Sequence, residues 1–83
     1  MDAGIKISDI ELYVINFVKN LREEKKLSQD DIANILGLTK AFIGNIESPK
    51  NRAKYNLNHI NILAEHFKMS PRDFLPENAY PTF

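Results

Sequence analysis

The 83-residue sequence contains no cysteine and no tryptophan, and it has only three glycines and four prolines. Without a thiol, the chain has no disulfide framework, no cysteine nucleophile, no cysteine-based zinc site and no iron–sulfur cluster. An excess of either charge is also missing, because eleven basic residues balance eleven acidic ones. A zero balance argues, on average, against a purely electrostatic nucleic-acid binder.

Long apolar runs are absent as well. No segment approaches the roughly 18–20 apolar residues that a membrane span needs. The N-terminal stretch MDAGIKISDIELYVINF has no basic leader followed by a clean apolar run, which a secretory signal would show. We therefore expect a cytoplasmic protein that does not associate with membranes.

The residues that are present suit a small soluble domain. Hydrophobic residues make up 43% of the chain and charged residues 27%, values that are typical of globular proteins. A chain of this length forms one domain that buries roughly 60–65% of the surface of its unfolded form. We expect a single domain over 8–76 and a C-terminal tail over 77–83.

Capping residues and apolar periodicity divide this domain into helices. Ser8 and Glu11 have the spacing of a capping box, and an apolar stripe follows at steps of three and four residues, which predicts a helix over 8–26. Ser28 caps a second helix, which ends at Gly37, where a left-handed residue is favoured. Thr39 then caps a third helix over 40–47.

Two more helices are expected after a polar loop over 48–56. Asn56 caps a fourth helix with apolar residues at helical spacing. Ser70 followed by Pro71 opens a short fifth helix that stops before Pro76. No strand pattern is visible, so the sequence predicts an all-α domain of five helices.

The stretch QDDIANILGLTKAFIGNIES, residues 29–48, carries the functional information. Two short helices joined by a three-residue turn must cross steeply and touch directly. The small Ala33 permits that contact, and Gly37 suits a turn that needs positive φ. Apolar residues hold both helices to a core, namely Ile32, Leu36, Leu38, Ile43 and Ile46.

LREEKKLSQDDIANILGLTKAFIGNIES, together with NLNHINILAEHFKMSPRDFL, resembles the helix-turn-helix domain of the phage-repressor/Cro-type transcriptional regulators over about residues 10–75. The resemblance implies a compact five-helix, lambda-repressor-like fold in which the third helix reads DNA. It also implies homodimers on palindromic operators, a backbone contact by Gln29, and a structural ion pair between Arg22 and Glu47.

The geometry of the third helix independently indicates a recognition face. At about 100° per residue, Ile43 and Ile46 define a buried side, and the opposite side faces outward. Such a helix enters the major groove by its N-terminal part. The candidates for base contacts are therefore Lys40, Ala41, Phe42 and Asn45. Phe42 lies on a flank of the helix, where it either joins the core or contacts DNA.

These side chains match known pairings with base edges. Lys40 can donate to guanine or to a phosphate, and Asn45 can pair bidentately with adenine. Ala41 and Phe42 can touch a thymine methyl group. The family usually has a polar or basic residue at the position of Ala41, so we expect few direct hydrogen bonds from this helix to base edges.

Phosphate contacts are expected around this helix. Besides Gln29, the candidates are Thr39, Lys50, Asn51, Arg52 and Lys54. Residues 40–54 hold four basic residues and one acidic residue, a net charge of +3, whereas residues 1–39 carry −2 and residues 55–83 carry −1. The zero total therefore conceals one basic segment.

Apolar residues outside the predicted stripes leave two alternatives open. Ile15 lies off the main face of the first helix, and Phe74, Tyr80 and Phe83 cluster near the C-terminus. Either the tail folds back over its own domain, or these C-terminal aromatic residues form a dimer interface.

No pattern in the sequence indicates an enzyme, a metal site or a cofactor. His59 and His66 are separated by a rise of about 10 Å on one helix, too far for one ion without further ligands. The sequence thus favours a sequence-specific DNA-binding regulator, a repressor or the antitoxin of a toxin–antitoxin pair, which would also have a protein partner. The alternative is a protein-interaction module that keeps the fold without binding DNA.

Overall fold

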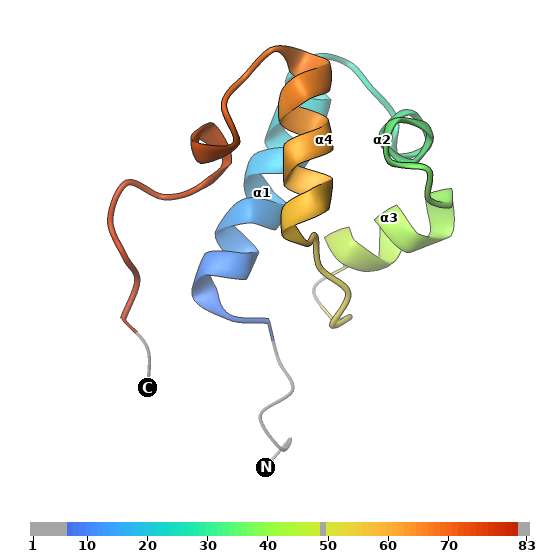
Figure 1. Cartoon of the computed structure of the whole chain (residues 1–83). Coiled ribbons are helices and arrows are strands. Elements are labelled where there is room, and N and C mark those ends of the chain that lie inside the picture. Colours follow the sequence, from blue (N-terminus) through green and yellow to red (C-terminus); the bar gives the residue numbers. More distant parts are fainter. Residues whose placement is uncertain (1–6, 49, 82–83) are drawn as a thin grey trace.

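A computed structural model describes residues 7–48 and 50–81 of the chain. It contains four α-helices and one 3₁₀ turn: α1 (Asp9–Glu24), α2 (Gln29–Leu36), α3 (Lys40–Glu47), α4 (Leu57–Phe67) and η1 (Pro71–Phe74). The described residues include no strand, in agreement with the all-α prediction. In Figure 1, α2 and α3 lie on one side of α4, and η1 with the tail lies on the other.

The predicted fifth helix is wrong, because η1 is a single 3₁₀ turn of four residues. Ser70 caps it and Pro71 opens it as expected. Leu75 is already extended, with φ −113° and ψ 153°. A residue that precedes a proline is pushed away from the helical region, so Pro76 ends the turn before an α-helix can form.

The helices begin where the sequence indicated. The capping box of Ser8 and Glu11 is present, and Ser28, Thr39 and Asn56 each cap the next helix. Asp31 closes a second capping box with Ser28. These bonds are made within four residues of one another, so they depend on local sequence alone.

Left-handed residues end three of the helices. Gly37 has φ +70° and ends α2 as predicted. Lys26 and Lys68 have φ +60° and +58°, respectively, after α1 and α4. The first helix was expected to continue through Lys26, but it ends at Glu24 because the backbone reverses at Lys26 and Leu27 N–H donates to the Arg22 carbonyl, 2.8 Å away.

The core draws residues from all five elements, and α1 contributes most. Ile15 is only 4% exposed, although it was expected to lie outside the core. Both α3 and η1 pack against α1, so its buried stripe is wider than one helix face. By contrast Ile10 and Leu57, expected in apolar stripes, are 41% and 79% exposed in the first turns of their helices.

The C-terminal aromatic residues fold back onto the domain. Phe74 is completely buried, and its ring lies 4.9 Å from that of Phe17. Of the two alternatives for Phe74, the structure therefore supports the one in which it covers its own domain, because the core takes up its whole surface. Tyr80 packs edge-on against Tyr13 at 6.1 Å, and Phe83 falls outside the described residues.

Candidate nucleic-acid interface

The turn between α2 and α3 sets how the two helices cross. Gly37 supplies the left-handed conformation, and Leu38 N–H donates to the Ala33 carbonyl at 2.9 Å. Ala33 is 1% exposed, so its small side chain is enclosed in the core on the buried side of α2. The structure therefore contains the helix-turn-helix arrangement that the spacing predicted.

Helix α3 has one buried and one open face. Ile43 is fully buried and Ile46 is 2% exposed. Lys40, Ala41 and Asn45 are exposed, as the helical geometry predicted. Phe42 is half-buried and packs against the core, which favours the core alternative over a DNA contact.

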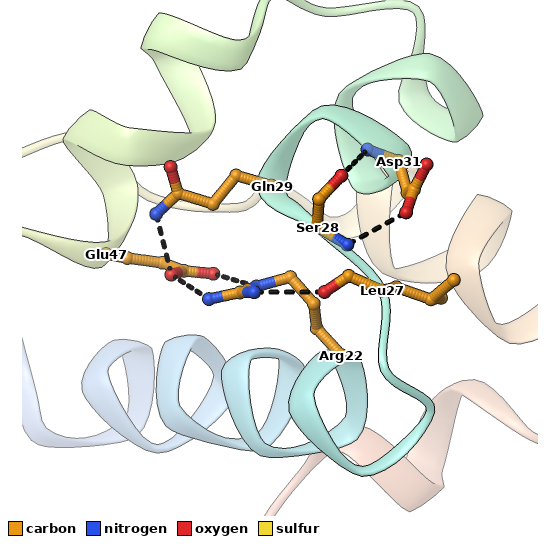
Figure 2. A network of polar contacts seen from close by, with 6 residues as sticks. All are labelled: Arg22, Leu27, Ser28, Gln29, Asp31 and Glu47. Atoms are coloured by element: carbon orange, nitrogen blue, oxygen red, sulfur yellow. Dashed lines mark hydrogen bonds and ion pairs between the residues drawn. The ribbon is translucent and has the colours of Figure 1, made fainter.

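Arg22 and Glu47 tie α3 to α1 (Figure 2). Arg22 Nε donates to Glu47 Oε2 at 3.0 Å, and Nη2 donates to Oε1 at 2.8 Å, so the ion pair that the resemblance implied is present and bidentate. The side chains are 13% and 5% exposed, respectively. The hydrogen bond to Glu47 raises the pKa of Arg22 above its ordinary value. Arg22 Nη1 also donates to the Leu27 carbonyl, which fixes the chain just before α2.

Gln29 joins the same network, which the sequence analysis did not anticipate. Its Nε2 donates to Glu47 Oε1 at 3.0 Å, across the gap between α2 and α3 (Figure 2). A carboxylate has about four acceptor sites, and the guanidinium of Arg22 fills only two of them. Glu47 near the edge of the core was therefore the signal in the sequence that a further donor was needed. Gln29 is thus engaged within the protein as well as being a candidate phosphate contact.

The other candidate phosphate contacts differ in whether their side chains already have partners within the protein. Lys50 and Arg52 are exposed in the loop after α3. Lys54 Nζ lies 2.7 Å from Glu11 Oε2, so its charge is shared with α1. Thr39 Oγ1 accepts from Phe42 N–H and Asn51 Oδ1 accepts from Ala53 N–H, which leaves the Thr39 hydroxyl and the Asn51 amide as donors.

Tyr55 is a core residue close to the ion pair of Arg22 and Glu47, and its role was not predicted from the sequence. It is 7% exposed, and within the described part of the chain its hydroxyl has no hydrogen-bond partner. Burial and the nearby Glu47 carboxylate raise the pKa of this phenol. The group therefore stays neutral beside the ion pair.

The remaining polar groups show capping roles rather than a second site. His59 Nδ1 accepts from Asn56 N–H in the capping box of α4. Residues 7–48 and 50–81 contain no cluster of three or more metal-ligating side chains. No helix in this same part of the chain combines the length and the apolar character needed to cross a membrane.

Comparison with known proteins supports the assignment of the turn. A family model described as a helix-turn-helix domain matches residues 15–78, which include the whole of α2, α3 and α4. Searches of curated proteins and of solved structures returned no match. The family match spans most of the chain, and the geometry of α2, Gly37 and α3 agrees with it. The chain therefore belongs to the helix-turn-helix domain family.

Proposed function

We propose that the protein binds double-stranded DNA sequence-specifically, with α3 in the major groove, and that it acts in the cytoplasm as a small transcriptional repressor. The observation that carries the proposal is the division of α3 into a buried face and an open one. Ile43 and Ile46 hold the helix to the core, while Lys40, Ala41 and Asn45 stay exposed. A helix held in this way can present its outer face to base edges.

The open face offers a small set of base contacts. Lys40 would donate to guanine, Asn45 would pair with adenine, and Ala41 would lie against a thymine methyl group. Gly44 lies between these residues on the same helix. A Cβ added there would meet only Gln29 Oε1, at an ordinary 3.5 Å, so nothing within the described protein requires a glycine. Close approach of a DNA strand accounts for it.

The charge distribution supports binding at this face. The ion pair to Arg22 offsets Glu47, the one acidic residue of 40–54. The basic residues there are Lys40, Lys50 and Arg52, together with Lys54, whose charge is shared with Glu11. A modest local charge gives weak non-specific affinity, so we propose that homodimers bind a palindromic operator and thereby double the contacts.

Tyr80 is the described aromatic residue that fits a dimer surface. It is 38% exposed and lies with Leu12, which is 47% exposed, along a groove between α1 and the tail. Truncation after Pro76 removes Tyr80, so we expect the mass in solution to fall from dimer to monomer. A truncated chain that stays dimeric would exclude the tail as the interface.

Binding of mixed-sequence and selected duplexes at several salt concentrations tests the function. We expect the logarithm of the binding constant to fall linearly with the logarithm of salt concentration, and the slope to shrink by about one in Lys50→Ala. Arg72→Ala removes an equal charge from η1, which packs against α1 and α4, and should leave the slope unchanged. Failure of the wild type to bind any duplex would instead favour a protein-interaction module.

An antitoxin role is a variant of the same proposal. Such a protein would bind its operator through α3 and a toxin through another surface. Copurification of a stoichiometric protein partner, with operator binding retained, would identify it.

A further inference from the structure

The Gln29 side chain occupies an unusual place in the helix-turn-helix. It belongs to the first residue of α2, yet its amide nitrogen is bonded to Glu47, the last residue of α3. The start of α2 and the end of α3 are therefore linked by a side chain, whereas the turn links the other two ends of these helices. Glu47 is itself held by two hydrogen bonds from Arg22, so its carboxylate has a fixed position.

The chemistry of the network fixes the orientation of the amide. Glu47 Oε1 can accept a hydrogen bond but cannot donate one, so Gln29 Nε2 must face it. The amide oxygen then faces α3, where it lies 3.5 Å from the position of a Cβ on Gly44. Nε2 carries a second hydrogen, and no side chain or carbonyl of the described residues accepts it.

We propose that Glu47 is a positioning residue, which holds the Gln29 amide so that its second N–H is available to a DNA phosphate. The inference rests on the proposed function. An exposed glutamine side chain loses conformational entropy when it is ordered by a ligand. In this protein the bond to Glu47 orders the side chain before DNA arrives. Arg22 contributes indirectly by fixing Glu47.

A double-mutant cycle separates this role from a general effect on stability. The apolar pair Arg22→Met/Glu47→Leu replaces the largely buried ion pair with side chains of similar size, a change that proteins often tolerate. Gln29→Ala is measured in the wild type and in this background. The probe is a fluorescent mixed-sequence duplex at one salt concentration, because a phosphate contact is independent of sequence.

The positioning role predicts coupling between the two changes. Gln29→Ala should weaken binding about tenfold in the wild type, as expected when one hydrogen bond to a charged group is lost. The apolar pair should weaken binding by a similar factor while keeping the thermal transition cooperative. Adding Gln29→Ala to the apolar pair should then cost less than threefold. Asn34→Ala, an exposed amide elsewhere on α2, should leave the affinity unchanged.

Two results would overturn the inference while leaving DNA binding intact: no effect of Gln29→Ala in the wild type, or an equal effect in both backgrounds. A wild type that binds no duplex would overturn the proposed function and this inference with it.

Nuclear magnetic resonance of the wild type provides a test that does not depend on the folding of any variant. On addition of the duplex, one Gln29 side-chain amide proton should shift while the proton bonded to Glu47 keeps its frequency. If both protons move together, Glu47 does not hold the amide in the complex.

Discussion

At the scale of single residues, Glu47 connects three helices, because its carboxylate on α3 accepts hydrogen bonds from α1 and α2. Its carboxylate receives three hydrogen bonds, two from Arg22 and one from Gln29, while its side chain is 5% exposed. Glu47→Ala would remove two of the three hydrogen bonds of the partly buried Arg22 guanidinium and leave only the one to the Leu27 carbonyl. We expect the free energy of unfolding to fall by about 1–3 kcal/mol, measured by urea denaturation. Glu24→Ala, exposed at the end of α1, is the control, and a loss below about 1 kcal/mol for Glu47→Ala would contradict this account.

His59 makes the stability depend on pH. Burial lowers its pKa below the ordinary 6.5, and Nδ1 must be unprotonated to accept from Asn56 N–H. As pH falls below 6.5, the unfolded chain takes up a proton that the folded chain resists, so the free energy of unfolding should decrease. His59→Gln keeps an acceptor at the third helical position and should flatten this dependence.

Two comparisons isolate the contribution of His59. His66→Gln changes the other histidine of α4 and should leave the dependence in place. The carboxyl of Glu11 also has a lowered pKa, because of its hydrogen bond from Lys54, but its contribution is lost only as pH falls below 4.5. A His59→Gln profile identical to that of the wild type between pH 5.5 and 7.5 would exclude His59 as the cause.

Gly44 offers a residue-scale test of the DNA face. Alanine has a helix propensity about 1 kcal/mol better than glycine, and the added Cβ fits at 3.5 Å from Gln29 Oε1. Gly44→Ala should therefore raise the melting temperature and yet weaken binding to a selected duplex. If both stability and affinity rise, Gly44 is not a point of close approach.

At the scale of helices, the caps that begin the four α-helices were predicted, and so were the ends of α2 and α3, whereas α1 ends two residues before its predicted end at Lys26. Ser28 and Asn56 act on backbone groups within three residues, so local sequence is sufficient. Lys26 and Lys68 take up left-handed conformations in which lysine has no advantage, so no residue type marked these ends. The left-handed residues turn the chain so that Leu27 and Met69 pack against the core. This packing involves residues distant in the sequence, so local sequence does not reveal where these two helices end.

The left-handed backbone conformation of Lys68 predicts that glycine at this position stabilises the protein. A non-glycine residue in this conformation destabilises the folded state by roughly 1–2 kcal/mol. Substitution by glycine relieves this strain, but the greater freedom of glycine in the unfolded chain offsets part of the gain. Lys68→Gly should therefore raise the free energy of unfolding by about 0.5–1 kcal/mol. Glu65→Gly, inside the same helix, should lower it by about 1 kcal/mol. Chemical denaturation of both variants checks the opposite signs, and a destabilised Lys68→Gly would contradict the argument.

The candidate site was predictable to a similar degree. The exposure of Lys40, Ala41 and Asn45 followed from helical periodicity once Ile43 and Ile46 were assigned to the core. The bond between Gln29 and Glu47 joins residues 18 positions apart, and only the crossing of α2 and α3 brings them together. Phe74 became a core residue for the same reason, because the chain returns to α1 after α4.

At the scale of the whole molecule, the proposed function depends on where the charges lie rather than on their sum. The chain has no net charge, yet residues 40–54, which comprise α3 and most of the loop that follows it, carry +3. The ion pair of Arg22 and Glu47 removes the one acidic group from that surface and ties it to the core. The same contacts therefore stabilise the fold and shape the surface offered to DNA.

The proposed role of Lys40 and Asn45 on α3 is to read DNA sequence. Its most direct test is the ratio of affinities for a duplex selected by the wild type and for a mixed-sequence duplex at equal salt. Each change, Lys40→Ala and Asn45→Ala, should reduce this ratio about 5- to 150-fold, the value of one good base contact of about 1–3 kcal/mol, while Arg72→Ala leaves it unchanged. A ratio that stays at the wild-type value in both variants would contradict recognition by this face.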